Sequence, residues 1–588
     1  MAFGRAPGDS VLVRRQIGYA DTLLTFEGNP YGNPNPILAN YAQQYEDLVG
    51  SASGFSSYLQ SNGIINGSAP NQIYGLYNNV GRQTGYNYQE NDQISLRFKF
   101  SADIKKHAIQ AGGEYEQRKD RSFNVFPRDL WNVMNQLANN HIELGTIPIP
   151  DPGIQNGDTL FYENVAGPNQ SVFATNIRKK LGITNQGQYV DVNSLDPSTL
   201  DINLFSANEL ITNTTWRYSG YDYKGNKLTG KSNFNDFFTD TVNRPAGAFQ
   251  PIYMAGYIQD KFTFKDLIIR LGVRVERFDA NQKVLSDKYS LYAVRKAGDV
   301  TEINNTPVTH PSNIGSDYIV YVEDARTGGE IRGYRSGNRF YDASGNLVDN
   351  ADVLKSRSAG RVTPYLAETV VFDQFGNPKL SASSFKDYVP QTSVLPRLAF
   401  SFPISDEAVF FANYDILTQR PLTNVYSDPF DYLFIERRSQ GVVVTSPDLR
   451  QERTVDYQVG YKQKISQSAA LSITAFYREL RDQLQQVNLV NAYPLGYASY
   501  ENRDFGTIKG FTFDYDLRRT GNASLKMSYT LQFADGTGSS ANSSANLLAT
   551  GQGNLLIPIA LSYDQRHTFV SSFDYRYGQG SAYDGVES

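Results

Sequence analysis

Segments of about ten residues, apolar at every second position, recur along this chain. In residues 92–102, Ile94, Leu96, Phe98 and Phe100 take alternate positions, and Arg97 lies among the polar residues between them. A repeat of two is typical of a β-strand, because successive side chains point to opposite faces. A strand with one apolar and one polar face suits a transmembrane β-barrel, whose outer wall meets lipid while its inner wall meets water.

The gaps between these segments alternate between short and long. We predict about eleven strands, with a weaker twelfth candidate at residues 11–26. The segments cover residues 92–102, 109–116, 252–264, 267–278, 397–402, 409–417, 454–464, 470–482, 508–517, 524–534 and 568–577. The long gaps cover residues 119–250, 281–396, 418–453, 483–507 and 535–567. Because bacterial barrels have short periplasmic turns and long extracellular loops, we expect the long gaps to lie outside the cell.

The fold class that follows is all-β: a partial transmembrane antiparallel β-barrel with large extracellular loops. We divide the chain into residues 1–91, a possible first strand plus an extracellular loop with a helix, and residues 92–588, the barrel strands with their long loops. Loops of this length should contain secondary structure of their own. Helical repeats predict two loop helices, at residues 37–59 and 128–139. The first two long gaps are expected to form one extracellular canopy.

The composition agrees with this fold and excludes other classes. The 40 Tyr and 34 Phe, against 2 Trp, suit the aromatic girdles of a membrane barrel. A mean hydropathy of -0.45 is no objection, because only every second residue of a strand needs to be apolar. No run of about 18 apolar residues is present, so the sequence predicts no membrane-spanning helix. The net charge of -5 gives no sign of a nucleic-acid-binding surface.

Little in the sequence indicates catalysis or metal binding. The histidines are His107, His141, His310 and His567. They lack the spacing of metal ligands, and no nucleophile or paired-carboxylate arrangement is evident, so we predict no metal, no cofactor and no enzyme activity. Residues 222–226, 342–346 and 373–377 share the pattern Asp-x-x-Gly-Asn after an aromatic residue. Their oxygen atoms suit calcium, but we favour hairpin turns in which the glycine takes a positive φ.

Two groups of aromatic residues in the long gaps are candidate ligand contacts. The candidates are Trp216, Tyr218, Tyr221 and Tyr223 in the first group, and Tyr426, Phe430 and Tyr432 in the second. Aromatic rings can stack on a sugar or grip a peptide. They can equally form the packed interior of a loop or an aromatic girdle, and the sequence leaves both interpretations open.

The two ends of the chain bear on whether the barrel is complete. Residues 1–10 contain no basic segment followed by an apolar one, so no signal peptide is predicted there. The last predicted strand is followed by no returning strand. An open sheet in lipid leaves backbone groups unpaired at a cost of several kcal/mol each. We therefore expect this chain to be an internal portion of a longer protein.

Several predicted strands carry motifs of one protein family. The segments AGYIQDKF at 255–262 and IRLGVRVERF at 269–278 resemble the Y-x-Q-D-x-W/F and L-G-x-R-x-E/D strand pair of TonB-dependent outer-membrane receptors. The segments PDLRQERT at 447–454 and YQVGYK at 457–462 resemble their N-P-D-L-x-P-E-x-T and Y-E-V-G-x-K strand entry, with Gln451 in place of the family's Pro. Three further segments resemble the Oar-like subgroup: PRLAFSFPI at 396–404, FANY at 411–414 and TQRP at 418–421.

The resemblance implies a barrel of about 22 strands, closed by an N-terminal plug, of which this chain supplies about half. It implies import of an extracellular ligand across the outer membrane, driven by the TonB complex through a TonB box ahead of the plug. The implied partners are outer-membrane lipid, an unknown extracellular ligand and the TonB complex, the last through N-terminal segments that we do not recognise here. Two alternatives remain open: a structural or adhesive outer-membrane surface protein without transport, and a soluble β-rich carbohydrate-binding protein.

Overall fold

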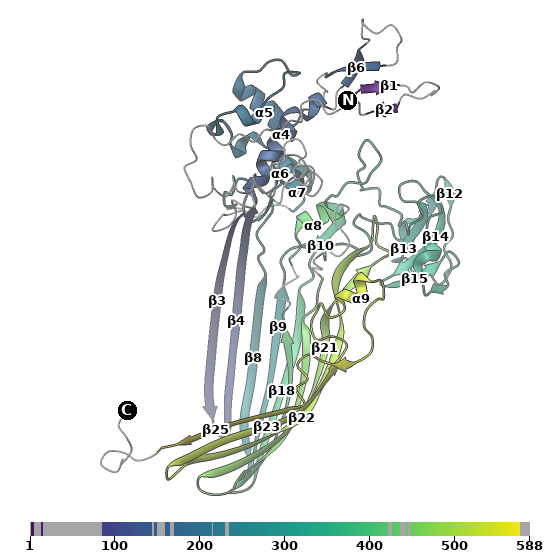
Figure 1. The fold of residues 1–588 in the computed structure, drawn as a ribbon. Coiled ribbons are helices and arrows are strands. Elements are labelled where there is room, and N and C mark those ends of the chain that lie inside the picture. The colour runs from purple at the N-terminus through teal and green to yellow at the C-terminus, as the bar shows by residue number, and fades with distance from the viewer. Residues whose placement is uncertain are drawn as a thin grey trace. The chain divides into compact units, whose positions relative to one another are not determined.

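The chain folds into two compact units, shown as a computed structural model in Figure 1. Unit 1 comprises Met1–Gln89, Arg121–Ser232 and Asp240–Ala246, and unit 2 comprises Glu90–Asp120, Asn233–Thr239 and Gly247–Ser588. The residues that the structure describes are 2–4, 13–15, 85–143, 146–149, 159–164, 170–213, 216–229, 234–420, 426–435, 443–444 and 448–576.

Long antiparallel strands form one curved sheet, which makes up most of unit 2 (Figure 1). The strands are β3 (Tyr86–Ile104), β4 (His107–Val125), β8 (Ile252–Phe264), β9 (Leu267–Asp279), β18 (Gln391–Ser405), β19 (Ala408–Gln419), β20 (Glu452–Lys464), β21 (Ala469–Leu489), β22 (Tyr497–Thr520), β23 (Ala523–Gly536) and β25 (His567–Tyr575). Each pairs with the next in sequence, and β24 (Ile559–Ala560) also pairs with β23. Among the described residues, β3 and β25 are not paired with each other. The predicted partial antiparallel barrel is therefore confirmed.

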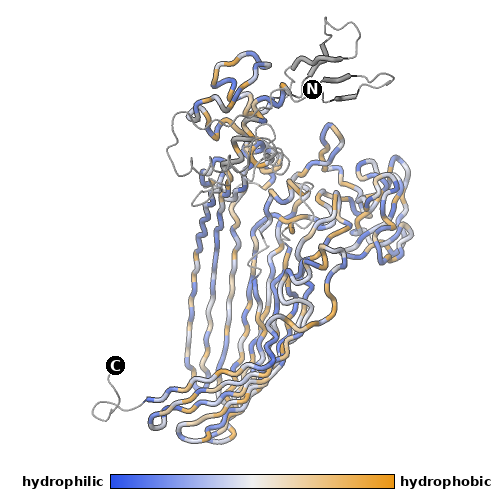
Figure 2. Tube along the Cα trace, in the orientation of Figure 1, coloured by the Kyte–Doolittle hydropathy of each residue, from blue (hydrophilic) through white to orange (hydrophobic). Residues whose placement is uncertain are grey.

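The strand register places the predicted apolar residues together on one face. Val273, at the centre of β9, stands directly between Ile258 of β8 and Pro396 of β18. On β3, the apolar side chains at positions 94, 96, 98 and 100 are 60% to 67% exposed. Figure 2 shows hydrophilic and hydrophobic residues recurring in turn along the long strands. Apolar side chains that no protein covers are what the lipid-facing wall of a barrel requires.

Leu271 lies on this outer face too, as predicted, and is 46% exposed. Its direct partner on β8 is Asp260, which bonds to His107 Nδ1 at 2.6 Å. His107 is the first residue of β4, directly after the tight turn that ends β3. The outer wall thus carries one polar pair at the short-turn end of the sheet.

Most strands run further than the alternation predicted. β21 and β22 remain paired as far as Leu489 and Tyr497, so the predicted long gap at 483–507 is mainly an extension of this hairpin. The alternation ends earlier because polar residues such as Gln485 and Gln486 occupy both faces here, and both are buried against protein. Away from lipid, a strand needs no apolar face, and its sequence loses the repeat of two.

The long segments of unit 2 contain secondary structure of their own, as predicted. Residues 319–348 form an antiparallel sheet of β13 (Ile319–Asp324), β14 (Gly328–Ser336), β15 (Arg339–Asp342) and β16 (Leu347–Val348). The smaller elements are β10 (Lys283–Leu285), β11 (Glu302–Ile303), β12 (Thr306–Pro307), β17 (Phe385–Asp387), α7 (Asp236–Thr239), α8 (Pro429–Leu433), α9 (Ala545–Ala549), η5 (Ala297–Asp299), η6 (Ala351–Leu354) and η7 (Ala382–Ser384). Val320, Tyr321 and Val322 of β13 are fully buried, so these segments have an apolar core.

Unit 1 combines helices with short strands. Its helices are α4 (Pro127–Glu143), α5 (Val172–Leu181), α6 (Ala207–Asn213), η2 (Val192–Ser194), η3 (Pro197–Thr199) and η4 (Ile202–Leu204). The helix predicted at 128–139 is confirmed as part of α4, with Val133 and Met134 buried. Ser171 caps α5 by accepting a hydrogen bond from Ala174 N at 2.9 Å. Buried Arg178 of α5 donates to the carbonyl oxygen of Ala138 at 2.6 Å and thereby ties α5 to α4.

Short strands complete unit 1. They are β1 (Ala2–Gly4), β2 (Val13–Arg15), β5 (Thr146–Ile149), β6 (Thr159–Asn164) and β7 (Arg217–Ser219). Of the weak strand candidate at 11–26, the structure describes only β2, which pairs with β1 in a separate small sheet. The rest of this candidate lies outside the described residues. The helix predicted at 37–59 lies outside the described residues.

Candidate functional site on the inner wall

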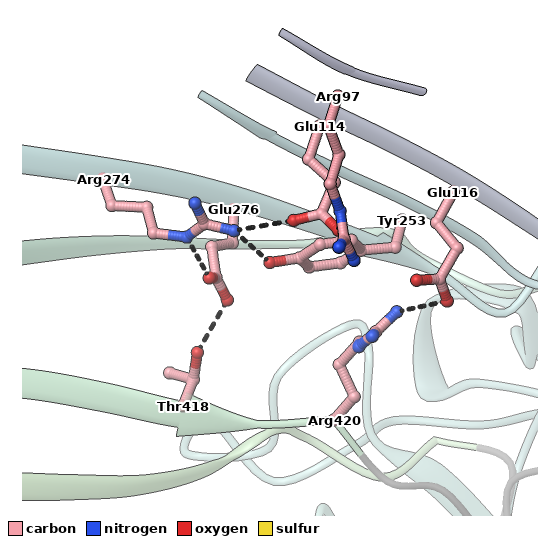
Figure 3. Close-up of polar contacts among 8 residues, drawn as sticks. All are labelled: Arg97, Glu114, Glu116, Tyr253, Arg274, Glu276, Thr418 and Arg420. Atoms are coloured by element: carbon pink, nitrogen blue, oxygen red, sulfur yellow. Dashed lines mark hydrogen bonds and ion pairs between the residues drawn. The ribbon is translucent and has the colours of Figure 1, made fainter. Parts of the chain in front are cut away.

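Side chains on one face of the barrel sheet reach across intervening strands. Thr418 Oγ1 of β19 donates to Glu276 Oε2 of β9 at 2.8 Å, across β18. Arg420, directly after β19, donates from Nη1 to Glu116 Oε1 of β4 at 3.0 Å, across β18, β9 and β8 (Figure 3). Only the concave side of a curved sheet brings such distant strands within reach. This face is therefore the inner wall of the barrel.

Arg274 lies at the centre of the inner-wall network (Figure 3). Its Nε donates to Glu276 Oε1 at 2.6 Å, and its Nη2 donates to the hydroxyl of Tyr253 at 2.8 Å and to Glu114 Oε2 at 3.4 Å. Glu114 Oε1 also accepts from Arg97 Nε at 2.7 Å. The side chains of Glu276 and Glu114 are only 10% and 18% exposed, whereas Arg97 is 71% exposed. Arg274 is thus the cation that two largely covered carboxylates share.

Arg420 joins the same network through Tyr253. Its guanidinium carbon lies 4.1 Å from the centre of the Tyr253 ring, a cation–π contact, while Arg274 bonds to the hydroxyl of that ring. Glu116, the carboxylate partner of Arg420, is 13% exposed. The arginines at 97, 274 and 420 balance the glutamates at 114, 116 and 276, so the network as a whole is neutral.

Paired charges continue along the inner wall towards the later strands. Asp415 of β19 stands directly opposite Asp456 of β20. Arg397 Nε donates to Asp415 at 2.7 Å and Arg478 Nε to Asp456 at 3.2 Å, so each aspartate has its own arginine. A wall of hydrogen-bonded ion pairs suits the polar interior of a transmembrane barrel and is incompatible with contact with lipid.

The first group of predicted ligand-contact aromatics lies in the interior of unit 1. Trp216, Tyr218, Tyr221 and Tyr223 are each at most 5% exposed. Trp216 Nε1 donates to the carbonyl oxygen of Tyr223 at 2.8 Å, and the Tyr218 hydroxyl donates to that of Arg244 at 2.9 Å. Burial raises the pKa of Tyr218 well above its ordinary value. The structure brings these four residues together as a packed core, one of the two interpretations that the sequence left open.

The second group is divided between neighbouring clusters of unit 2. The Tyr426 ring packs 5.5 Å from Phe249, whereas Tyr432 packs 5.3 Å from Phe385. Phe430 and Tyr432 are 2% and 1% exposed, and Tyr426 is half-buried. Tyr432 also lines a cavity of about 480 Å³ formed by the loops of unit 2. A direct ligand contact for either group stays a prediction.

The Asp-x-x-Gly-Asn segments are hairpin turns, as we favoured. Gly225, Gly345 and Gly376 have φ values of 88°, 86° and 84°. Asp342 accepts from the backbone and side-chain amides of Asn346 at 2.9 and 3.1 Å, and these hydrogen bonds lower its pKa. Across the described part of the chain, no group of three or more His, Asp or Glu side chains could hold a metal ion. None of its helices has the length and apolar character needed to cross a bilayer.

Sequence reasoning did not identify the inner-wall network. The alternation correctly assigns Arg274, Glu276 and Glu114 to the polar face, but it does not tell which polar residues meet. Thr418 and Glu276 are 142 positions apart, and only strand order and register bring them together. One sequence signal could have predicted part of this network. The polar face of β4 carries glutamates, the polar face of β9 carries an arginine, and only β8 lies between these strands.

A family model and several solved structures are similar to this chain. Residues 16–587 match the family model described as "TonB dependent receptor-like, beta-barrel". No curated protein matches the chain. Among solved structures, the FrpB iron transporter of Neisseria meningitidis is similar at a TM-score of 0.31 and 8% identity, over 76% of this chain and 37% of that one. The ferric yersiniabactin uptake receptor FyuA of Yersinia pestis is similar at 0.34 and 9%, over 84% and 42%.

The chain spans less than half the length of these two solved proteins, 37% and 42%. The family assignment comes from the family model, which covers residues 16–587. That family is one of receptors rather than enzymes, and its members are barrels of the outer membrane. This chain therefore belongs to the TonB-dependent receptor-like β-barrel family and is an outer-membrane protein.

Proposed function

We propose that this chain is the barrel portion of a receptor that captures an extracellular ligand and imports it across the outer membrane with energy supplied through TonB. We further propose that the receptor is of the Oar-like type, on the strength of the segments at 396–404, 411–414 and 418–421. The observation that supports transport is the paired charges of the inner wall. Its carboxylates at 114, 116 and 276 are largely covered yet all paired with arginines, an arrangement that keeps a passage polar without leaving charges unpaired.

The long loops are the ligand-binding side in this proposal. All the predicted aromatic residues except the half-buried Tyr426 are buried within them, and we propose that they shape the binding surface from beneath. Tyr432 is the member that lines a cavity. Loops held by an apolar core can present polar groups to a ligand at fixed positions, which reduces the entropy lost on binding.

Import is tested by measuring which compounds disappear from a defined medium. Three strains are compared: the wild type, a strain lacking the gene that encodes this chain, and a strain lacking TonB. We expect at least one compound whose depletion needs both genes, and restoration of the gene should restore its uptake. If the gene deletion leaves every depletion profile unchanged and alters only attachment or envelope integrity, the structural or adhesive alternative is correct.

The orientation of the barrel is tested by trypsin treatment of intact cells. Arg357, in the segment between β9 and β18, is 74% exposed, and we expect cleavage there in intact cells. Lys105, in the tight turn between β3 and β4, is also exposed and serves as the internal control. Cleavage at Lys105 should appear only after the outer membrane is permeabilised. The reverse order of cleavage would place the long loops in the periplasm.

A further inference from the structure

The loops of unit 2 line an open cavity of about 480 Å³, within the size range of small-molecule binding sites. Its walls come from separate parts of the chain: β10 and the segment after it, the end of β14, β17, α8, the segment before β20, the end of β21 and the start of β22. Lys288, Arg335, Lys386, Arg450 and Arg503 line it, together with Asp287, Asp448 and Glu501. Five cations and three carboxylates therefore line it, and Arg450 has a further carboxylate partner in Asp482, 2.7 Å from its Nη2.

The charges of this cavity are unequally matched. Glu501 is 15% exposed and is bonded by both Lys288 and Arg503, the latter through Nε at 2.6 Å. Two cations sharing one carboxylate leave a surplus positive charge at this point. Lys288 and Arg503 are 40% and 41% exposed, so both remain accessible from the cavity.

The other cations that line the cavity differ in how fully they are already bonded to protein groups. Arg335 is 6% exposed and is bonded to Asp287, to the Tyr321 hydroxyl at 2.8 Å and to the Gly337 carbonyl oxygen at 3.0 Å, so it serves as a structural group. Lys386 has only a loose contact of 4.0 Å with Asp448, and its side chain is 46% exposed. Lys386 thus adds a third accessible cation to the cavity wall.

Hydrogen bonds hold the walls of the cavity in place. The Tyr497 hydroxyl donates to the carbonyl oxygen of Lys288 at 2.7 Å. Asn502 accepts from Arg450 N at 2.7 Å and donates to the Arg450 carbonyl oxygen at 2.9 Å. These contacts fix the backbones that carry the cations before any ligand arrives. A preformed cluster of cations binds an anion at a lower entropic cost than a mobile one.

We propose that this cavity binds an oxyanion carrying at least two negative charges, held by Lys288, Lys386 and Arg503. Carboxylate and phosphate groups share this chemistry, and both form strong charge-assisted hydrogen bonds with lysine and arginine. The inference rests on the proposed function, because it assigns a chemical class to the extracellular ligand. It deepens that proposal by naming the residues that meet the ligand.

Binding is tested by calorimetry on the purified receptor in detergent, expressed from its complete gene. The probes are the peptide triglutamate for carboxylates and inorganic pyrophosphate for phosphates, with trilysine as the cationic control. At least one anionic probe should bind, and binding should weaken as salt is added. Which of the two binds identifies the oxyanion. Failure of both anions, or equal binding of trilysine, would overturn the proposal.

The residues are tested with Arg503→Gln and Lys386→Gln, each of which should weaken binding of the anionic probe about tenfold. Lys283→Gln is the matched control. Lys283 pairs with Asp387 at 2.9 Å in the strand next to the cavity but does not line it, so its loss should leave affinity unchanged. An equal loss with Lys283→Gln would show that only the overall charge matters, and the site would be rejected.

The outcome is separable from that of the import experiment. Anion binding needs neither TonB nor transport. If the receptor binds pyrophosphate or triglutamate but depletes no compound from the medium, the anion site is supported and the proposed import function is rejected. If the receptor imports an uncharged compound and binds neither anion, the import function is supported and the anion site is rejected.

Discussion

Val273→Arg should lower the unfolding free energy of the barrel by about 2 to 4 kcal/mol, the cost of placing arginine on the lipid face near the middle of the bilayer. Val273 is the central residue of β9, and its cross-strand neighbours, Ile258 and Pro396, offer no counter-charge. Urea unfolding of the folded receptor in lipid vesicles, followed by gel mobility without heating, measures the change.

Two control variants make this result specific. Leu271→Arg should cost less than Val273→Arg, because Asp260 stands directly opposite position 271 and can pair with the new guanidinium. Gln259→Arg, on the inner face beside Gly272, should be milder still because that face meets water. If Gln259→Arg destabilises more than Val273→Arg, the assignment of inner and outer walls is reversed.

Arg274→Met should destabilise the barrel by about 2 to 3 kcal/mol. Removing one partner of a buried ion pair leaves an uncompensated charge and costs roughly 3 to 5 kcal/mol, and the partial exposure of Arg274 places its effect below that range. Two carboxylates, Glu276 and Glu114, lose their shared cation in this variant. The same urea titration measures the loss.

Arg97→Met is the matched control for the inner wall. Arg97 bonds to the same Glu114, but its side chain is 71% exposed, so its removal should cost at most about 1 kcal/mol. Adding Glu276→Gln to Arg274→Met should restore part of the stability, because the second change removes one of the unpaired charges. Equal effects of Arg97→Met and Arg274→Met would contradict the central role assigned to Arg274.

Local pattern was enough to predict much of this fold. The alternation correctly places the side chains at positions 94, 96, 98 and 100 of β3, and at 271, 273 and 275 of β9, on the exposed outer face. Neighbouring side chains of a strand necessarily point in opposite directions. The turns at 222–226, 342–346 and 373–377 were also predictable, since Asp, Gly and Asn at these spacings satisfy the turn within five residues.

The sequence was less informative where lipid no longer imposes a pattern. At positions 485–487 and 498–500 of the hairpin, consecutive residues are buried, so both faces contact protein there and the repeat of two disappears although β21 and β22 continue. The aromatic residues at 216–223 and 426–432 show the same limit. The sequence around a loop aromatic residue does not distinguish a ring packed in the interior from a ring exposed to a ligand. Only the fold decides its burial.

Within the alternating segments, the sequence by itself determined which side chains face lipid and which face the lumen, because these properties depend on neighbours in the chain. The tertiary structure alone decided which polar side chains meet. Arg420 reaches Glu116 over a sequence separation of 304 residues, and Lys288 shares Glu501 with Arg503 over 213. Such contacts depend on strand order, register and sheet curvature. These are properties of the whole barrel, and a local sequence pattern does not reveal them.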